Sequence, residues 1–106
     1  MCAPESGTVF VRIEQFAIKP GAEEKAIPLL REHAEFIAKA PGCRRAYLAS
    51  PIHGPAHLVY TEWESEVDIE RLEASLRSNP AASGSFFGLM GLVRSPPHVA
   101  RFQVLE

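Results

Sequence analysis

The sequence predicts one α+β domain in which helices cover a single face of a four-stranded antiparallel sheet. The chain has 106 residues, 46% of them apolar, which suits one hydrophobic core. Segments rich in β-branched and aromatic residues alternate with helical apolar spacing in the order strand, helix, strand, strand, helix, strand. This order is typical of the ferredoxin-like, split βαβ arrangement. We expect residues 1–7 to form a flexible tail and residues 8–106 to form the domain.

The first strand is expected at residues 8–19, which are rich in Val, Ile and Phe. Alternation along a strand places Val9, Val11 and Ile13 on one face. The opposite face receives Phe10, Arg12, Glu14 and Phe16. A Pro-Gly pair at residues 20–21 then ends the strand.

The next segment, residues 22–40, predicts a helix with a wide buried face because apolar side chains recur at intervals of three and four. Pro28 conflicts with this pattern, since a proline inside a helix removes one backbone hydrogen bond and costs about 3 kcal/mol. We therefore expect either a separate first turn or a kink at this residue. A second Pro-Gly pair, at residues 41–42, ends the helix.

Two further strands are expected at residues 44–50 and 57–63, joined by a loop rich in Pro and Gly. Ser65 has the sequence context of a helix N-cap, and apolar residues at helical spacing follow it. Within this helix we expect Glu73 and Arg77 to form an exposed i, i+4 ion pair.

Another helical piece is expected at residues 81–94, followed by a last strand at residues 99–105. Glycines interrupt this piece, and each costs roughly 0.5 to 1 kcal/mol relative to alanine inside a helix. We therefore expect a loosely held helix in which Gly84 and Gly88 allow close backbone packing on a neighbour.

Both faces of the predicted strands carry apolar residues, as Val11 beside Phe10 and Leu58 beside Val59 illustrate. A sheet that is apolar on both faces must be covered on both, and the helices cover only one of them. We therefore expect a homodimer in which the sheets of two copies face each other.

Charge and apolar patterning argue against several classes of protein. The formal charge of -2 and the pI of about 6.1 leave no basic footprint for nucleic acid or for an anionic membrane. The longest apolar window, residues 86–93, is far shorter than the roughly 18 residues of a membrane span. The first residues also lack the pattern of a secretory signal. We expect a cytoplasmic protein with no nucleic-acid or membrane partner.

The two cysteines, Cys2 and Cys43, have neither the spacing of metal ligands nor that of a redox pair. Cys43 begins a predicted strand, where we expect a buried, inert thiol.

Three short motifs resemble a known family. They are Lys-Pro-Gly at residues 19–21, Pro-Gly at residues 41–42 and Trp-Glu-Ser-Glu at residues 63–66. In order and spacing, from about Val9 to Val104, they resemble the antibiotic biosynthesis monooxygenase family of dimeric α/β-barrel proteins. The resemblance implies a homodimer with a pocket between sheet and helices in each subunit.

The resemblance also implies a reaction. The best understood oxygenases of the family use neither flavin nor metal, so we expect no cofactor and no metal site. An electron-rich phenol or anthrone is deprotonated, and the resulting anion itself reduces dioxygen. The protein would supply a dry aromatic pocket, a base or hydrogen-bond partner, and orientation. We therefore predict a cofactor-independent monooxygenase acting on a small aromatic or quinol-like molecule.

The chain departs from the polyketide-oxidising members of the family at most of their functional positions. Their tryptophan is retained as Trp63. Their asparagine, histidine, tyrosine and arginine fall at or near Val59, Leu48, Ile69 and Ser83. The alternative function is therefore a non-catalytic small-molecule-binding or dimerisation module that keeps the fold without the catalytic groups.

The haem-degrading branch of the same superfamily fits the sequence less well. Its asparagine, tryptophan and histidine fall at about Glu14, Leu72 and residues 81–83. Because no histidine occurs between His57 and His98, that helix offers no axial haem ligand.

Trp63, Glu14 and His33 are the candidate catalytic residues. Glu14 shares a strand face with Arg12, where a buried carboxylate beside a cation would have a shifted pKa. His33 lies in an apolar row of the first helix and would serve as a base if it faces the cavity. The structural alternatives are a core or interface anchor for Trp63, an ion pair or dimer contact for Glu14, and a hydrogen-bonded core-edge histidine for His33. The candidate substrate-binding residues are Arg12, Phe86, Phe87 and Met90.

Overall fold

The computed structural model describes residues 9–105, apart from the side chains of residues 80–83. The predicted tail at residues 1–7 and Cys2 lie outside this part of the chain. Its helices and strands are β1 (Phe10–Ala17), α1 (Glu23–Ala38), β2 (Cys43–Ala49), β3 (Ala56–Trp63), α2 (Glu66–Ser78), α3 (Pro80–Met90) and β4 (His98–Gln103).

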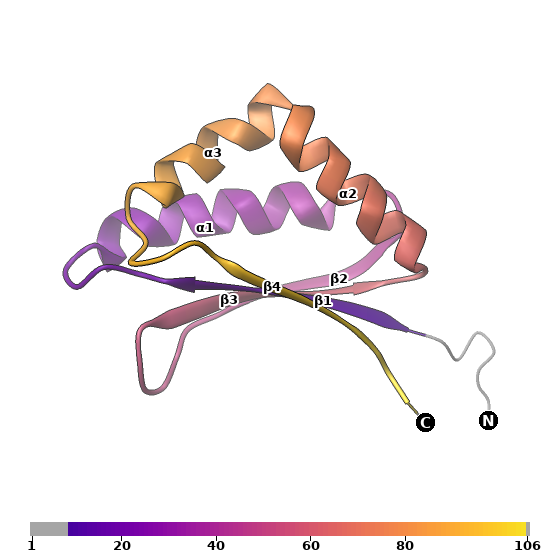
Figure 1. Cartoon of the computed structure of the whole chain (residues 1–106), viewed down its shortest axis with the longest axis horizontal. Coiled ribbons are helices and arrows are strands. Elements are labelled where there is room, and N and C mark those ends of the chain that lie inside the picture. The colour runs from indigo at the N-terminus through magenta and orange to yellow at the C-terminus, as the bar shows by residue number, and fades with distance from the viewer. Residues whose placement is uncertain (1–8, 106) are drawn as a thin grey trace.

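The four strands form one antiparallel sheet in the order β2-β3-β1-β4. Figure 1 shows α1, α2 and α3 gathered on one side of this sheet, with none of them on the other side. The predicted α+β, ferredoxin-like fold is thereby confirmed. Within one chain the sheet is open and does not close into a barrel.

Alternation along the central strands decides which side chains face the helices. Arg12, Glu14 and Phe16 of β1 are buried on the helix side, and Val59 and Trp63 of β3 are buried beside them. The hydrophobic core lies between this face and the helices. Its most deeply buried members are Phe16, Ile18, Ala26, Leu30, Ile37, Val59, Trp63, Ile69, Leu72 and Leu89.

Helix α1 runs without interruption through Pro28, so a separate first turn does not form. Pro28 lacks the N–H that would donate to the carbonyl of Glu24, one turn earlier. Glu24 is exposed, which leaves this carbonyl close to water. The opposite side of the helix buries Ala26, Leu30 and Ile37. This burial offsets the local cost of the proline.

Ser65 caps α2 as predicted, because its hydroxyl accepts a hydrogen bond from the backbone N–H of Asp68 at 3.3 Å. Gly42, with φ of +88°, lies directly beside this first turn. A Cβ at Gly42 would collide with the carboxylate of Asp68. The glycine that ends the α1–β2 turn therefore also lets the start of α2 pack closely on it.

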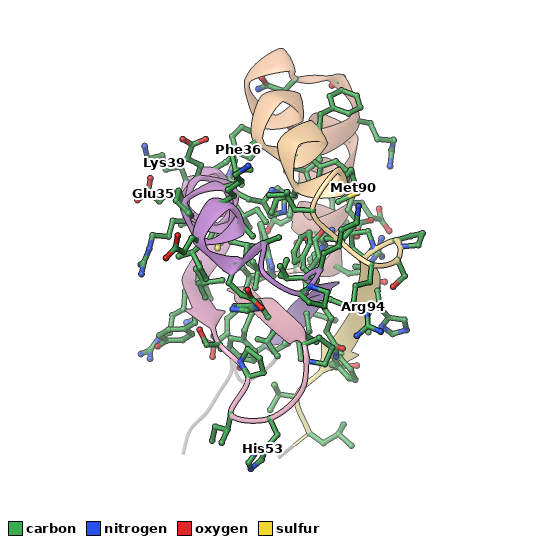
Figure 2. All side chains as sticks on the ribbon, turned by 90° about the vertical axis from the view of Figure 1, so that its left-hand side faces the viewer. Glu35, Phe36, Lys39, His53, Met90 and Arg94 are labelled. Atoms are coloured by element: carbon green, nitrogen blue, oxygen red, sulfur yellow. The ribbon has the colours of Figure 1, made fainter. Side chains whose placement is uncertain are left out.

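Helix α3 ends at Met90, so the helix predicted at residues 81–94 is too long. The backbone beyond it bonds to the end of β1 instead. Arg94 N–H donates to the carbonyl of Ala17 at 2.7 Å, and Val93 forms a β-bridge with Ile18. Figure 2 labels Met90 and Arg94 at the two ends of this segment. These bonds to β1 replace the helical ones.

One glycine of α3 marks close packing on α1. A Cβ at Gly88 would lie 2.9 Å from a methyl of Leu29, which confirms the predicted backbone approach at this residue. A Cβ at Gly84 would meet nothing within 4 Å in the described part of the chain, so the same expectation is wrong for Gly84.

The face of the sheet away from the helices carries apolar and aromatic side chains. Because Glu14 faces the helices, Val11 and Ile13 of the same strand face the other way. Their cross-strand neighbours include Phe102, which is 50% exposed, and Tyr60. The two-sided apolar pattern predicted for the sheet is thus present in the folded chain.

Candidate functional site

Three ionisable side chains meet between β1 and α1. Glu14 is 2% exposed, and its Oε1 lies 2.8 Å from Nε2 of His33. The same oxygen accepts a hydrogen bond from Nη1 of Arg12 at 3.2 Å. Arg12 and Glu14 share one face of β1 because they are two residues apart, and His33 reaches them from the buried row of α1. The sheet therefore carries paired charges inside the core.

Charged side chains of alternating sign continue from this cluster to the surface. Arg12 Nε donates to Oε2 of Glu73 on α2 at 3.1 Å, and Oε1 of Glu73 accepts from Nη2 of Arg101 at 2.6 Å. Arg12 and Arg101 are direct neighbours across β1 and β4, where two cations would repel each other. Glu73 binds both guanidinium groups and so removes this repulsion.

The buried carboxyl group of Glu14 and the half-buried one of Glu73 both favour their charged form. Burial by itself raises the pKa of Glu14, but the hydrogen bond and charge of His33, together with Arg12, outweigh it. The net shift in the pKa of Glu14 is therefore downward. Burial also raises the pKa of Glu73, and the hydrogen bonds from Arg101 and Arg12 turn the net shift downward there too. Both groups are ionised at neutral pH.

The second ring nitrogen of His33 is free. Its Nδ1 is buried and has no hydrogen-bond partner within residues 9–105. The rings of Phe16 and Phe86 lie against the imidazole, with centroids 5.7 Å and 5.8 Å away. Nε2 of the same ring faces Glu14 at 2.8 Å, so the carboxylate fixes the orientation of the imidazole. A carboxylate that orients an imidazole in this way is typical of acid-base sites.

A cavity of about 350 Å³, named here the β1–α2–α3 pocket, opens beside this network. Arg12 and Glu14 are its buried polar members, whereas Phe87 is 73% exposed. Its walls therefore combine apolar and aromatic side chains with one buried, ionised carboxylate. The residues that line it are Arg12, Glu14, Glu73, Leu76, Arg77, Phe86, Phe87 and Val99.

Four of the candidate residues line this pocket together: Arg12, Glu14, Phe86 and Phe87. His33 does not line it. From its place on α1, His33 contacts Glu14 of β1 and Phe86 of α3. The structure thus places His33 behind the carboxylate that faces the cavity.

Trp63 and Met90 lie outside the pocket. The Trp63 side chain is fully buried in the core, and its indole N–H donates to Oγ1 of Thr61 at 2.7 Å. The Thr61 hydroxyl donates in turn to the carbonyl of Arg12 at 3.2 Å. Trp63 is therefore connected to the strand that carries Arg12. Met90, labelled in Figure 2, packs against the core at the end of α3.

Sequence reasoning missed Glu73, Arg77 and Arg101 as members of the site. The expected ion pair between Glu73 and Arg77 is wrong, because Glu73 binds Arg12 and Arg101 instead. Arg12 was the residue from which further acidic partners could have been predicted. A buried guanidinium has five donors and needs more acceptors than Glu14 alone provides.

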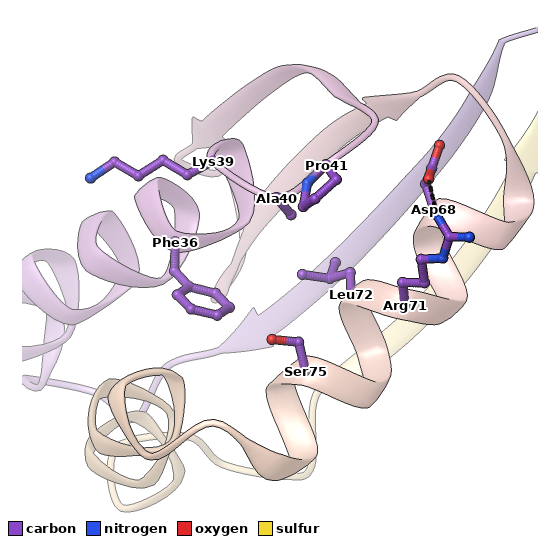
Figure 3. Close-up of a pocket in the computed structure, with 8 residues that line it drawn as sticks. All are labelled: Phe36, Lys39, Ala40, Pro41, Asp68, Arg71, Leu72 and Ser75. Carbon is purple, nitrogen blue, oxygen red and sulfur yellow. Dashed lines mark ion pairs between the residues drawn. The ribbon is translucent and has the colours of Figure 1, made fainter.

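A second hollow, named here the α1–α2 groove, has a volume of about 320 Å³. Figure 3 shows Phe36 of α1 on one side of it and Leu72 and Ser75 of α2 on the other. The ion pair at its end is exposed, since the Arg71 side chain is 72% accessible and lies 3.6 Å from Asp68. The charges of the groove thus remain close to solvent.

Cys43 begins β2 opposite Trp63 and is half-buried. Burial raises the pKa of its thiol, which disfavours the reactive thiolate. Within residues 9–105 no group of three or more His, Cys, Asp and Glu side chains is arranged to hold a metal ion. In the same part of the chain, no helix has the length and apolar character needed to cross a bilayer.

Solved structures with the same fold include proteins of several bacteria. Rv0793 from Mycobacterium tuberculosis has a TM-score of 0.75 and 18% identity, over 92% of this chain and 96% of that chain. SnoaB, a cofactor-independent oxygenase from Streptomyces nogalater, has a TM-score of 0.73 and 17% identity, over 92% and 94%. The monooxygenase of the gene ActVA-Orf6 from Streptomyces coelicolor, in complex with nanaomycin D, has a TM-score of 0.70 and 23% identity, over 92% of this chain and 88% of that chain.

No curated protein matches the sequence of this chain. The family model described as antibiotic biosynthesis monooxygenase matches residues 9–104. This match covers almost all of the residues whose fold and pocket are described above. The chain therefore belongs to the antibiotic biosynthesis monooxygenase family.

Proposed function

We propose that the protein is a homodimeric monooxygenase that oxidises a small aromatic or quinol-like substrate with dioxygen and needs no bound cofactor. The observation that supports this most is the β1–α2–α3 pocket, in which Phe86 and Phe87 face the same cavity as the ionised carboxylate of Glu14. Membership of the family supports the reaction class. SnoaB, a structural neighbour, is a cofactor-independent oxygenase.

In this proposal Glu14 accepts a hydrogen bond from the hydroxyl group of the substrate. Arg12 and His33 are positioning residues that keep the carboxylate charged and fixed. Transfer of a proton from a simple phenol to a carboxyl whose pKa lies below 4.5 is uphill by more than about 5 units, roughly 7 kcal/mol. Glu14 therefore suits substrates that are more acidic than a simple phenol.

The proposed reaction converts a ring CH2 group, as in an anthrone, into a carbonyl. The substrate loses a proton to Glu14, and its anion passes one electron to dioxygen. The two radicals combine into a carbon-bound peroxide anion, which takes this proton back and loses water as the new C=O bond forms. One oxygen atom enters the product and the other leaves as water, so that R2CH2 + O2 gives R2C=O + H2O. Phe86 and Phe87 form the aromatic part of the wall around these steps.

The remaining candidates have supporting roles in the proposal. Trp63, through Thr61, holds the backbone at Arg12 in place. Met90 anchors the end of α3, the helix that provides Phe86 and Phe87. A second copy of the chain covers the open face of the sheet, because the apolar side chains there are left exposed in one copy.

Oxygen uptake with dithranol, an anthrone, tests the proposed reaction. The wild-type protein is expected to consume oxygen above a heat-inactivated control and to place one atom of labelled dioxygen in the new carbonyl. Replacing Glu14 by Gln is expected to lower the rate by about 100-fold. Glu64→Gln, a change at an exposed residue, is the matched control and is expected to have no effect. No uptake above the heat-inactivated control would contradict the proposal.

A non-catalytic small-molecule-binding module is the second candidate. Val59 and Ile69, at positions where the polyketide-oxidising relatives carry polar groups, are fully buried core residues here. Ser83, near the position of their arginine, has a side chain outside the described residues. Saturable binding of dithranol without oxygen uptake would favour this second function over the first.

A further inference from the structure

The charged side chains that line the β1–α2–α3 pocket differ in whether they have an ion-pair partner. Arg12, Glu14 and Glu73 are paired among themselves and with Arg101. Arg77, on the last turn of α2, lines the same pocket and has no ion pair within residues 9–105. Arg77 is therefore the one charged side chain of the pocket wall that forms no ion pair in the described part of the chain.

The position of Arg77 separates it from the other cations. Glu73, one turn earlier on the same helix, binds Arg12 and Arg101 and is not available to Arg77. The carbonyls at the C-terminus of α2 favour a nearby cation but carry only partial charge. A ligand with an anionic group would give Arg77 the partner that α2 does not provide.

From these observations we infer that the substrate carries an acidic group, such as a carboxylate, and that Arg77 binds it. This inference specifies the substrate class of the proposed oxidation, and it rests on that proposed function. A guanidinium holds its charge at every physiological pH and can bind a carboxylate through two parallel hydrogen bonds.

The pocket also sets the direction in which such a substrate lies. An acidic group cannot occupy the buried side, because the Glu14 carboxylate there is already ionised and would repel it. A neutral hydroxyl suits Glu14, since it can donate a hydrogen bond to the charged oxygen. Arg77 is exposed, so the acidic group lies at the solvent side. Leu76, Phe86 and Val99 add apolar surface to the same cavity.

Calorimetric titration with two matched probes tests this orientation. 5-Hydroxy-1-naphthoic acid has a phenol on one ring and a carboxylate on the other, and its primary amide differs only in lacking the negative charge. The wild-type protein is expected to bind the acid about tenfold more tightly than the amide. This preference is expected to shrink as salt is added, because the pair with Arg77 is exposed.

Two arginines of α2 provide the variant and its control. Arg77→Gln is expected to remove the preference for the acid and to leave the affinity for the amide unchanged. Arg71→Gln is expected to keep the preference, because Arg71 lies on the same helix but lines the α1–α2 groove. Circular dichroism verifies that both variants are folded.

Equal binding of the two probes by the wild-type protein would overturn the inference, as would a preference that survives in Arg77→Gln. Binding of neither probe would overturn it as well, because the pocket would then not accept an aromatic acid. The proposed oxidation fails separately, when dithranol is not oxidised. Preferential binding of the acid without oxygen uptake would keep the role of Arg77 and reject the reaction.

Discussion

The β1–α2–α3 pocket and the α1–α2 groove have similar volumes, about 350 and 320 Å³, and α2 forms a wall of each. They differ in where their charges lie. The pocket contains the buried pair of Arg12 and Glu14, whereas the ion pair of the groove, Arg71 and Asp68, is open to solvent on the arginine side. Volume alone therefore does not mark a functional site in this fold. Buried charges that are costly to maintain distinguish one hollow from the other.

The largest expected difference concerns the free energy of unfolding that is lost when an ion pair of either hollow is broken. Arg12→Met leaves the buried Glu14 carboxylate without its guanidinium partner and is expected to destabilise the protein by about 3 kcal/mol. Arg71→Met removes a solvent-exposed partner and is expected to cost less than about 0.5 kcal/mol. Urea titration of both variants measures these values. Equal losses would mean that burial does not distinguish the two pairs.

A turn glycine tests how the end of the groove is built. Gly42→Ala is expected to cost about 2 to 3 kcal/mol, because alanine is strained at positive φ and its Cβ collides with Asp68. Gly21 has a similar φ of +81° and open space around its Cβ position, so Gly21→Ala is expected to cost only about 1 kcal/mol. Thermal unfolding measures the difference. A cost for Gly42→Ala no greater than that for Gly21→Ala would show that contact with Asp68 is unimportant.

The pH dependence of stability tests the charged state of Glu14. Because its pKa is lowered in the folded protein, it contributes stability above the ordinary value of 4.5 that is lost as the pH falls below that value. The Glu14→Gln variant is therefore expected to lose less stability than the wild-type protein on acidification through this range. Urea titrations at several pH values measure the two slopes. Parallel curves would show that Glu14 is not held in its charged form.

The smallest effect is expected at the rim of the pocket. Phe87 is 73% exposed, so Phe87→Ala is expected to change stability by less than about 0.5 kcal/mol. The same change removes part of the aromatic wall and is expected to weaken binding of 5-hydroxy-1-naphthoic acid by about threefold to tenfold. Ser75→Ala, in the groove, is expected to leave binding unchanged. A loss of affinity in Ser75→Ala with none in Phe87→Ala would move the site to the groove.

Local patterns predicted the fold because they are read within single elements. Alternation along β1 placed Arg12 and Glu14 on the helix side, and Ser65 marked the start of α2. The Ala81 to Arg94 helix was predicted too long because pairing of residues 91–94 with the end of β1 is a tertiary contact. The helix propensities of the residues in that segment do not indicate this pairing with β1.

The sequence predicted candidate residues on β1, α1 and α3, but not the ion pairs that connect β1 and β4 to α2. Glu73 turns toward the sheet because β1 and β4 place Arg12 and Arg101 side by side, and one carboxylate is needed to bind both. Sequence spacing along α2 favoured Arg77 as its partner instead. Trp63 differs from Glu73 in this respect, because Thr61, which accepts its indole N–H, lies two residues away on the same strand.

A crystal structure of the protein with bound 5-hydroxy-1-naphthoic acid tests most directly which hollow is the site. The molecule is expected in the β1–α2–α3 pocket, with its hydroxyl within hydrogen-bonding distance of Glu14 and its carboxylate toward Arg77. Density for the molecule in the α1–α2 groove, or on the open face of the sheet, with the pocket empty, would contradict the proposed site.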